Sequence, residues 1–501
     1  MRTGALRILA AASLAAACTG VPAAAAEVAA TLADCHVAGI RNGVLCGSVQ
    51  RPLDPAHSER GTIEIRYVVV PAMARRKLAD PVFFLAGGPG QSAVALAGQV
   101  MSLFLRLNNR RDIVFVDQRG TGGSAPLTCK DDPDAESLAD QAVPERQLRL
   151  VTECKAALLK LPYLKTESDL GFFTTTIAVQ DLDAVRRQLG AERIDLVGGS
   201  YGTRVALEVL RQFPATVRRA VIDGVAPADM ALPASFSTDN QASFDRLVEA
   251  CAADPGCAKA HPDLHARFAA LLQALPREVK ATHPLTGREE TFLLTRELVL
   301  GAVRGALYSP TLAAALPEAL DSAARGDYAG LVGLGATQLA RKSSRLATGM
   351  HLSVVCAEDM PRLAASGDKP GADFGTVFGA LYEKLCAVWP RGSVPPAFYT
   401  LPKSGSPVLV LSGGIDPVTP PRHGERVAHA LGPMARHIVV ANAGHGVMAI
   451  GCMRDVVFRF IDAAADADAL AVEAGCASRV PRPPAFVSVR SANARASEPA
   501  R

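Results

Sequence analysis

Short apolar runs alternate with amphipathic segments along the first half of the chain. Residues 61–72 (GTIEIRYVVVPA) alternate in polarity and are rich in β-branched side chains, which predicts a strand. Two further apolar runs, 81–92 (PVFFLAGGPGQS) and 111–124 (RDIVFVDQRGTGGS), each end in a glycine-rich turn. Residues 174–190 (TTTIAVQDLDAVRRQLG) place apolar side chains at helical spacing and end on glycine, which predicts a helix.

The same alternation continues to residue 227 and returns near the C-terminus. Residues 193–200 (RIDLVGGS) predict a strand entering a turn, and 218–227 (RRAVIDGVAP) predict another strand. Two later strands are predicted within 406–420 (SPVLVLSGGIDPVTP) and 436–446 (RHIVVANAGHG). Short apolar strands that alternate with helices predict an α/β fold, with a mostly parallel sheet covered by helices on both faces.

Between residues 227 and 396 the pattern changes to segments rich in Ala and Leu, such as 264–276 (LHARFAALLQALP). We therefore predict a mainly helical cap or lid of residues 227–396, inserted after the sixth core strand. It would interrupt an α/β core formed by residues 27–226 and 397–478. A chain of 501 residues is long for one hydrophobic core, which agrees with two packed units.

Both ends of the chain are predicted to lie outside this fold. Residues 1–26 combine two arginines, an apolar run and a series of small residues, which is typical of a signal peptide. An alternative is a lipid anchor at Cys18, although the preceding leucine does not have lipobox spacing. Residues 479–501 are rich in Pro and Arg without periodicity and are expected to be a disordered tail. We expect an exported protein, periplasmic or secreted, without a membrane span.

Composition and cysteine usage narrow the classes further. The chain is 49% hydrophobic and 20% charged with a net charge of +4, and no basic stripe is interleaved with aromatic residues, so nucleic-acid binding is not expected. Apart from Cys18, ten cysteines remain, and an oxidising compartment would let them pair. Many connectivities are open, and the one we expect joins neighbours along the chain. These pairs are Cys35–Cys46, Cys129–Cys154, Cys251–Cys257, Cys356–Cys386 and Cys452–Cys476.

A metal site is the weaker alternative for the cysteines. Only Cys257, His261 and His265 approach the spacing of metal ligands, no C-x-x-C is present, and no H-E-x-x-H occurs. We expect neither a metal nor an organic cofactor.

The segment Asp195–Arg204, DLVGGSYGTR, contains a G-x-S-x-G pattern between a predicted strand and a predicted helix. A tight strand–serine–helix turn needs glycine at Gly198 and Gly202, because side chains there would clash. The turn would lift the hydroxyl of Ser200 to the carboxyl edge of the sheet. The pattern alone is weak, because a glycine-rich loop with a solvent-facing serine also matches it. The flanking strand and helix favour Ser200 as a nucleophile.

A serine nucleophile needs a base and an acid that orients the base. Of the ten histidines, His445 follows a predicted strand in a glycine-containing loop. Asp416 follows the preceding predicted strand, so one helix and one strand would bring both loops to the same edge. Asp223, which also follows a strand, is the alternative acid. The chain order Ser200, Asp416, His445 is that of α/β-hydrolases.

A tetrahedral intermediate also needs hydrogen-bond donors for its oxygen. The turn Ala86–Gly90 (AGGPG) follows an early strand, and its glycines leave backbone N–H groups free to face a substrate. The N–H of Tyr201 together with that of Gly87 or Gly88 would form an oxyanion hole. No phosphate-binding loop is expected, because neither Gly-Lys-Ser/Thr nor G-x-G-x-x-G is present.

In combination, LAGGPGQS, VDQRGTGGS, GGSYGT, SGGIDPVTP and AGHG make the chain resemble the proline iminopeptidase and tripeptidyl aminopeptidase family of α/β-hydrolases. The resemblance extends from about Leu45 to Cys476, with a tripeptidyl-aminopeptidase-like (TAP-like) last segment of about Phe378–Cys476. It implies a serine exopeptidase that releases residues or short peptides from free N-termini through an acyl-enzyme, with Ser200, Asp416 and His445 as the triad. Ala86 stands where proline iminopeptidases usually have histidine, which favours the tripeptidyl type.

The partner implied is a short peptide with a free N-terminus, and its ammonium group needs a carboxylate. We hypothesise that Glu358, with Asp359 second, binds this group, the alternative being two solvated acids on a loop. Two other functions stay open: an esterase or other acyl hydrolase with the same triad, and a non-catalytic or lipid-anchored binding protein that kept the fold.

Overall fold

The computed structural model describes residues 32–129, 137–141, 143–336 and 346–488. In these residues nine strands form one sheet, in the order β1-β2-β3-β5-β4-β6-β7-β10-β11. The strands are β1 (Ala33–Cys35), β2 (Val44–Pro52), β3 (Thr62–Val70), β4 (Val82–Leu85), β5 (Ile113–Val116), β6 (Ile194–Gly199), β7 (Val217–Asp223), β10 (Val408–Gly413) and β11 (Ala435–Val440). The first four strands in this order pair antiparallel, and all pairs from β5 to β11 are parallel.

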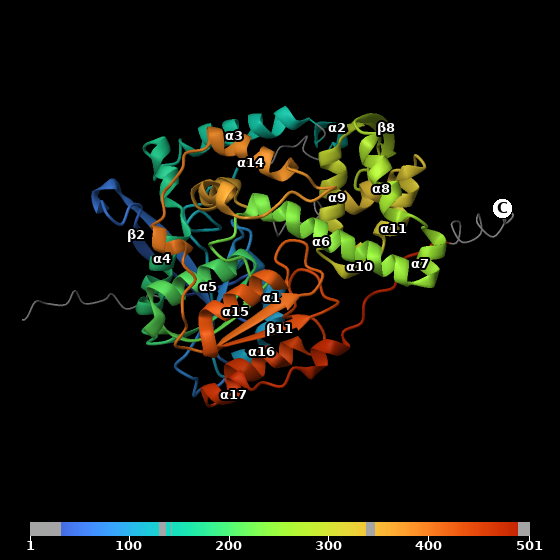
Figure 1. Cartoon of the computed structure of the whole chain (residues 1–501). Coiled ribbons are helices and arrows are strands. Elements are labelled where there is room, and N and C mark those ends of the chain that lie inside the picture. Colours follow the sequence, from blue (N-terminus) through green and yellow to red (C-terminus); the bar gives the residue numbers. More distant parts are fainter. Residues whose placement is uncertain (1–31, 130–136, 142, 337–345, 489–501) are drawn as a thin grey trace, which may run out of the picture.

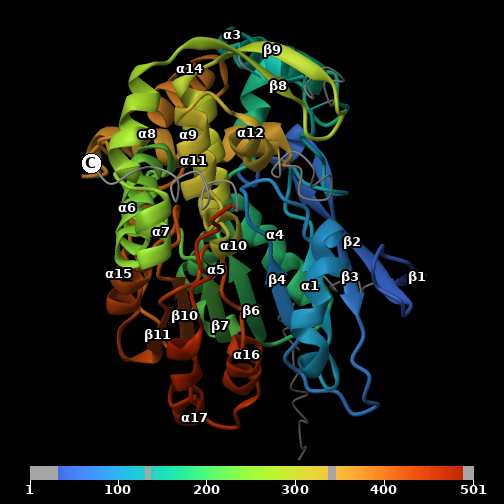
Figure 2. The ribbon, with the colours of Figure 1, turned by 90° about the vertical axis from the view of Figure 1, so that its right-hand side faces the viewer.

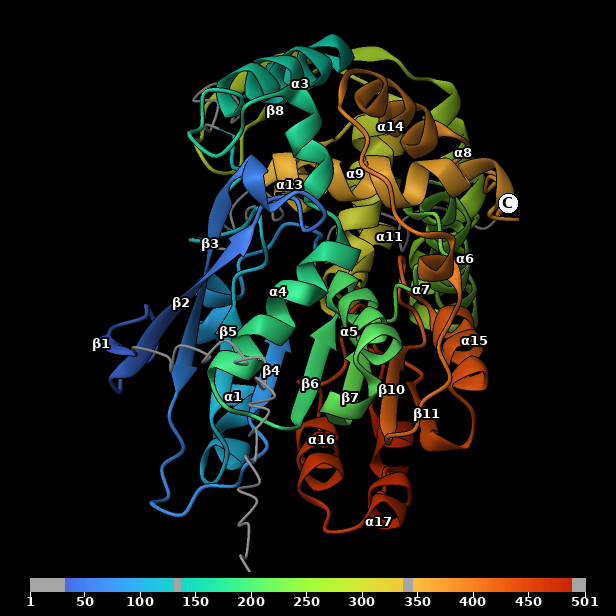
Figure 3. The ribbon, with the colours of Figure 1, turned by 90° about the vertical axis from the view of Figure 1, so that its left-hand side faces the viewer.

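Helices cover both faces of the sheet, as the alternating pattern predicts. On one face lie α4 (Thr175–Gln188), α5 (Tyr201–Gln212) and α15 (Pro421–Leu431), which Figure 3 shows in front of or beside the strands. On the other face lie α1 (Ala93–Asn108) and α16 (Met453–Asp462), with α17 (Asp466–Leu470) beyond it (Figure 2). Strands β4 (VFFL) and β5 (IVFV) are buried along their whole length, because a parallel strand between two helical layers has no solvent-facing side. The predicted α/β-hydrolase fold class is confirmed.

The segment between β7 and β10, which we call the cap, lies above the carboxyl edge of the sheet (Figure 2). It follows β7, the sixth strand when the three-residue β1 is left out. Its helices are α6 (Leu232–Ala253), α7 (Pro255–Ala260), α8 (Leu264–Gln273), α9 (Arg296–Leu307), α10 (Pro310–Ala313), α11 (Leu316–Ala324), α12 (Ala329–Ala336), α13 (Thr348–Val354) and α14 (Val377–Val388). Helices α6 to α12 enclose a hydrophobic core of their own, whereas the buried residues of α13 and α14 join the core on one face of the sheet.

Two features of the cap differ from the predicted helical pattern. A hairpin of β8 (Arg277–Thr282) and β9 (Glu289–Leu294) interrupts the helices. The helices α2 (Leu138–Gln141) and α3 (Pro144–Leu158), which precede β6 in sequence, pack against β9 and α14 (Figure 1). The amphipathic pattern identifies helices, but it does not show which of two hydrophobic cores they join.

The described residues contain five disulfide bonds: Cys35–Cys46, Cys129–Cys154, Cys251–Cys257, Cys356–Cys386 and Cys452–Cys476. These are the pairs expected from their order along the chain. The sulfur of Cys257 is therefore not available to a metal, and the alternative zinc site has lost one of its three ligands. His261 and His265 instead contact Asp321 and Asp373, respectively.

Part of the predicted tail is in contact with both the core and the cap. The carbonyl of Val480 accepts a hydrogen bond from Asn442, the N–H of Phe486 donates to Ala314, and Ser488 contacts Glu318. The rest of the tail, the predicted signal peptide and Cys18 lie outside the described residues. Among the helices that are described, none is long and apolar enough to cross a membrane.

Candidate active site

Ser200 lies in a sharp turn between β6 and α5. Its backbone has φ 55° and ψ −125°, a conformation that side-chain-bearing residues rarely adopt. Its N–H donates to the carbonyl of Asp223 at 2.8 Å, which fastens the turn to the neighbouring strand β7. A Cβ at Gly198 would lie 2.5 Å from the carbonyl oxygen of Gly202, and one at Gly202 would overlap the carbonyl oxygen of Leu85. Both glycines are therefore required by the close packing of this turn.

His445 and Asp416 are in direct contact. The Nδ1 of His445 lies 2.8 Å from Oδ2 of Asp416, whose side chain is fully buried. Asp416 also accepts hydrogen bonds from the N–H groups of Val418 and Thr419 and from the hydroxyl of Thr419. With Nδ1 donating to this carboxylate, Nε2 is the nitrogen left to accept a proton. The predicted order of loops, with Asp416 next to His445, is present in the structure.

The contact between these two side chains shifts both pKa values. Burial disfavours the charged imidazolium, but the charge of Asp416 and the hydrogen bond to it outweigh burial and raise the pKa of His445. Burial also disfavours the carboxylate, yet the charge of His445 and the hydrogen bonds that Asp416 accepts lower its pKa. The pair therefore stabilises an imidazolium beside a carboxylate.

Asp223, the alternative acid, has a different role. Its carboxylate accepts hydrogen bonds from the N–H groups of Val447, at 2.8 and 3.0 Å, and Met448, at 2.9 Å. Burial raises the pKa of Asp223 to about 6. Because its backbone carbonyl also binds the N–H of Ser200, Asp223 connects the serine turn with the loop that carries His445.

The strand order places these loops side by side. Strands β6, β7, β10 and β11 are consecutive and parallel, so the loops that follow them meet at one edge of the sheet. Gly224, directly after β7, lies under the imidazole: a Cβ there would be 3.2 Å from Cε1 of His445. Ser200, Asp416 and His445 are therefore positioned by neighbouring strands, as the sequence predicts.

The glycine-rich turn after β4 lies against Ser200. A Cβ at Gly87 would be 3.1 Å from Cβ of Ser200, so a side chain there would require Ser200 to shift by a few tenths of an ångström. Tyr201 is the first residue of α5, and its N–H has no acceptor within the helix. The cap holds this turn from above, since Ala347 donates to the carbonyl of Gly90 at 2.9 Å and the imidazole Nδ1 of His351 lies 3.0 Å from that of Pro89.

Glu358 and Asp359 are not solvated loop acids, and they do not offer a free carboxylate to a substrate. Both are fully buried in a π-helical turn, η5 (Val355–Asp359), and both are paired with Arg204 of helix α5, at 3.3 and 2.9 Å. Glu358 also accepts hydrogen bonds from the N–H and hydroxyl of Thr175, and Leu232 donates to Asp359. The expectation that they bind an ammonium group is corrected, because their acceptor sites are already used.

The same network supports the residue after the serine. The hydroxyl of Tyr201 lies 2.6 Å from that of Thr175 and accepts a hydrogen bond from Gln118 at 2.9 Å. Burial raises the pKa of Glu358 to about 7, even though Arg204 opposes this rise. Glu358 and Asp359 therefore bind the cap to helix α5, which begins at the serine turn. The isolated sequence VVCAEDMP contains no signal for this partner.

Sequence reasoning did not identify Tyr308, which covers His445. The two rings meet edge to face with centres 5.1 Å apart, and the N–H of His445 donates to the carbonyl of Tyr308 at 3.0 Å. The cap also contains a largely apolar cavity of about 750 Å³, lined by residues of α3, α9, α12 and α14. Neither feature could be found from local patterns, because each is formed by residues far apart in the sequence.

The fold and the geometry of the site define a serine hydrolase of the α/β class. The model of the family described as alpha/beta hydrolase fold matches residues 80–450, and the chain belongs to this family. It is 27% identical over 427 residues to serine protease Hip1 of Mycobacterium tuberculosis, covering 78% of this chain and 80% of that protein. It is 25% identical over 454 residues to tripeptidyl aminopeptidase of Streptomyces coelicolor, with 83% and 81% covered. Carboxylesterase B of Mycobacterium tuberculosis is 26% identical over 416 residues, with 77% and 78% covered. The chain is thus an α/β-hydrolase whose relatives include two peptidases and a carboxylesterase.

Proposed function

We propose that this protein is a serine exopeptidase that releases N-terminal residues or short peptides from oligopeptides. The contact between His445 and Asp416, at the sheet edge that also carries the strained Ser200, is the observation that supports it most. The relatives named as a serine protease and a tripeptidyl aminopeptidase support the peptidase class.

In this proposal Ser200 is the nucleophile and His445 the base. His445 Nε2 takes the hydroxyl proton while Oγ of Ser200 attacks the carbonyl carbon of the scissile bond. Asp416 orients the ring through Nδ1 and stabilises the imidazolium. Protonation of the leaving amine by His445 lets the C–N bond break and leaves an acyl group on Ser200. A water molecule, deprotonated by His445, then releases the acyl group and restores Ser200.

The oxygen of each tetrahedral intermediate carries a negative charge that backbone donors would stabilise. We assign this role to the N–H of Tyr201 together with that of Gly87 or Gly88. The close approach of Gly87 to Ser200 and the first-turn position of Tyr201 support the assignment. Each such donor is typically worth about 3 kcal/mol of transition-state stabilisation.

An esterase is the second candidate function, and three observations favour it. The chain resembles carboxylesterase B to the same degree as it resembles the peptidases. The acids expected to bind a free amine are paired with Arg204, and the cap cavity is mainly apolar. The substrate, rather than the triad, distinguishes the two candidates.

We also propose that the mature protein is exported, to the periplasm or the medium. Five disulfide bonds in one chain are expected in an oxidising compartment and are rare in a reducing cytosol. The predicted cleavage after Ala26 would be tested by N-terminal sequencing of the protein recovered from the periplasmic fraction; an intact Met1 would contradict export by this signal.

The decisive experiment compares p-nitroanilides of Ala, Pro and a tripeptide, each with a free and with an acetylated N-terminus, and p-nitrophenyl acetate. An exopeptidase of the proposed type cleaves the free-amine substrates and not the acetylated ones. Turnover of the ester alone would leave the serine hydrolase but refute the exopeptidase.

Two serine variants make this comparison specific. Ser200→Ala should abolish turnover of every substrate. Ser412→Ala is a matched control, because Ser412 is a buried serine of β10 whose hydroxyl lies 2.9 Å from His437 of the neighbouring strand β11. Ser412→Ala should turn over the substrates at the rate of the unmodified enzyme. Residual activity in Ser200→Ala equal to that of the unmodified enzyme would remove Ser200 from the mechanism.

A further inference from the structure

A cationic side chain lies beside the candidate site, on cap helix α9. The guanidinium carbon of Arg304 is 4.2 Å from the ring centre of Phe236 and 5.3 Å from that of Phe378. Its Nη2 donates to the hydroxyl of Tyr308 at 3.2 Å. Arg304 is thus held by aromatic faces and one neutral oxygen.

Arg304 has no carboxylate partner in the part of the chain that the structure describes. Its Nε is buried and has no hydrogen-bond acceptor. By contrast, the fully buried Arg204 and Arg119 are both paired with carboxylates. A guanidinium presents five N–H donors, and Arg304 is partly buried with its Nε out of contact with water, which is unfavourable for a cation without an anion. The donors of Arg304 that are not used therefore favour an anionic ligand.

Arg304 is linked to the candidate base His445 through Tyr308. Tyr308, to which it is bonded, packs on the ring of His445 and accepts the N–H of that residue. Burial has the largest effect on the pKa of both His445 and Tyr382. The charge of Arg304 lowers both pKa values; it follows burial for Tyr382, whereas for His445 the contributions of Asp416 and Asp223 are larger. Phe378, whose ring centre lies 5.3 Å from the guanidinium carbon of Arg304, lines the cap cavity.

The chemistry of His445 identifies which part of a substrate would meet Arg304. In the proposed mechanism His445 gives its proton to the leaving group, so the leaving part of the substrate passes next to its imidazole. The ring of Tyr308 packs on that imidazole, and the hydroxyl of Tyr308 accepts a hydrogen bond from Arg304. A carboxylate on the leaving part would reach the guanidinium, whereas an ammonium group there would be repelled.

We propose that Arg304 is a specificity residue that binds the free C-terminal carboxylate of the leaving portion of a short peptide. This inference rests on the proposed function and deepens it, because it limits the substrate to peptides short enough for the carboxylate to reach Arg304 from the scissile bond. A bidentate contact between guanidinium and carboxylate would supply the anion that Arg304 lacks.

The test is the ratio of kcat/KM for tri- and tetraalanine as free acids to kcat/KM for the same peptides as C-terminal amides. The unmodified enzyme should prefer the acids by roughly 10- to 100-fold, the range expected for a hydrogen bond to a charged group. In Arg304→Met the ratio should fall to about 1, and in Arg304→Lys it should be intermediate, since lysine keeps the charge but not the planar fork. The ratio does not depend on how much of a variant is folded, because both substrates are measured on one preparation.

Arg362→Met is the matched control. Arg362 is also a cap residue, its guanidinium lies 5.0 Å from the ring centre of Tyr399, and its buried Nε has no acceptor. It should keep the ratio of the unmodified enzyme. A ratio near 1 in the unmodified enzyme, or an unchanged ratio in Arg304→Met, would overturn the proposal. The peptide Ala-Ala-Ala-Glu amide, which has a side-chain carboxylate but no C-terminal one, distinguishes the two possible carboxylates. If Arg304 raised kcat/KM for this peptide and not for the free acids, the bound group would be a side-chain carboxylate and not the C-terminus.

Failure of the exopeptidase proposal remains distinguishable from failure of this one. If no peptide is cleaved, 4-acetoxybenzoate is compared with its methyl ester, since the leaving group then carries the carboxylate. A preference for the acid that is lost in Arg304→Met would support Arg304 as a carboxylate site in an esterase. Equal turnover of the two esters would overturn it.

Discussion

At the scale of single residues, Asp416 controls the basicity of His445. Because the net effect of burial and of Asp416 raises the pKa of His445 above its ordinary value of 6.5, the ring is protonated over a wider acidic range. A protonated imidazole cannot accept the proton of Ser200. We therefore expect kcat/KM to fall as the pH decreases through a pKa above 6.5, which a pH–rate profile would measure.

Asp416→Asn should lower kcat by about 10⁴-fold, because the amide no longer holds His445 in the tautomer whose Nε2 can accept a proton. The loss of the negative charge should also move the acidic limb of the profile to lower pH. Asp321→Asn is the control, since Asp321 is a fully buried acid that contacts His261 within the cap. Asp321→Asn should lower the free energy of unfolding without shifting the acidic limb of the pH–rate profile. An acidic limb that stays in place in Asp416→Asn would contradict the assigned pairing.

The glycines of the serine turn provide a second prediction at this scale. Gly202→Ala places a Cβ against the carbonyl of Leu85, so the free energy of unfolding should decrease by roughly 1–3 kcal/mol. Gly199→Ala is the matched control one residue before Ser200, because a Cβ there meets no atom within 4 Å. Its unfolding free energy should change by about 0.5 kcal/mol or less. Chemical denaturation of both variants measures the difference, and equal effects would contradict the packing argument.

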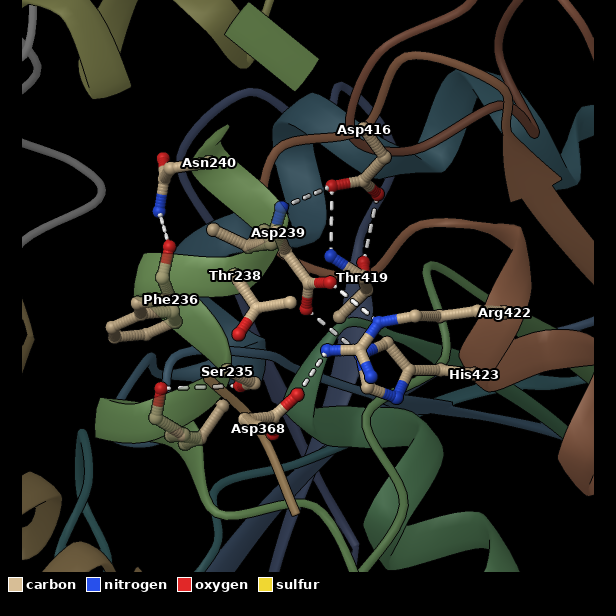
Figure 4. A network of polar contacts seen from close by, with 12 residues as sticks. Ser235, Phe236, Thr238, Asp239, Asn240, Asp368, Asp416, Thr419, Arg422 and His423 are labelled. Atoms are coloured by element: carbon tan, nitrogen blue, oxygen red, sulfur yellow. Dashed lines mark hydrogen bonds and ion pairs between the residues drawn. The ribbon is translucent and has the colours of Figure 1, made fainter. Parts of the chain in front are cut away.

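At the scale of elements, cap helix α6 is fastened to the loop that carries Asp416. Ser243 donates to the carbonyl of Ile415 at 2.8 Å, and Arg246 donates to that of Gly414. Figure 4 shows Asp239 of α6 paired with Arg422 and His423, at the beginning of α15. The cap therefore not only covers the site but also helps to position Asp416.

Asp239→Asn should test this connection. The change leaves His423 buried beside a neutral amide, and we expect the free energy of unfolding to fall by about 2 kcal/mol, less than for a completely buried pair because Arg422 is 43% exposed. The measurement is thermal unfolding together with kcat, which should also decrease. Asp229→Asn is the control, because its pair with Arg426 is partly exposed and should be worth 0–1 kcal/mol. Similar losses of unfolding free energy in both variants would contradict a larger contribution from the buried pairs of Asp239 than from the partly exposed pair of Asp229.

The elements of the core were predictable because each follows from a local pattern. Fully apolar runs such as VFFL and VLVLSG became parallel strands, and the glycine turns after them lie at one edge. The hairpin β8–β9 was not predicted, because its two strands are half exposed in a cap whose composition is otherwise helical. Local periodicity was too weak there to compete with the Ala- and Leu-rich surroundings.

At the scale of the whole molecule, the disulfide bonds limit how far the cap can unfold. In the chain-entropy model, removing Cys356–Cys386, which closes a span of 30 residues, costs about 3.6 kcal/mol. Removing Cys251–Cys257, which closes 6 residues, costs about 2.2 kcal/mol. Both bonds are buried in the cap, so paired Cys→Ser variants form a matched comparison. Thermal unfolding should show the larger loss for Cys356–Cys386; the reverse order would mean that native packing, and not loop length, dominates.

The sequence by itself determined the α/β architecture, the order of the candidate triad and the expected disulfide pairs. Each of these depends on short-range information: strand periodicity, glycines that a tight turn requires, and neighbours along the chain. Only the tertiary structure decided that Asp416 rather than Asp223 contacts His445, that Arg204 occupies Glu358 and Asp359, and that Arg304 has no carboxylate partner among the described residues. The pair of Arg204 and Asp359 joins residues 155 positions apart, and local patterns contain no information about such a pair because packing, not sequence neighbourhood, brings its charges together.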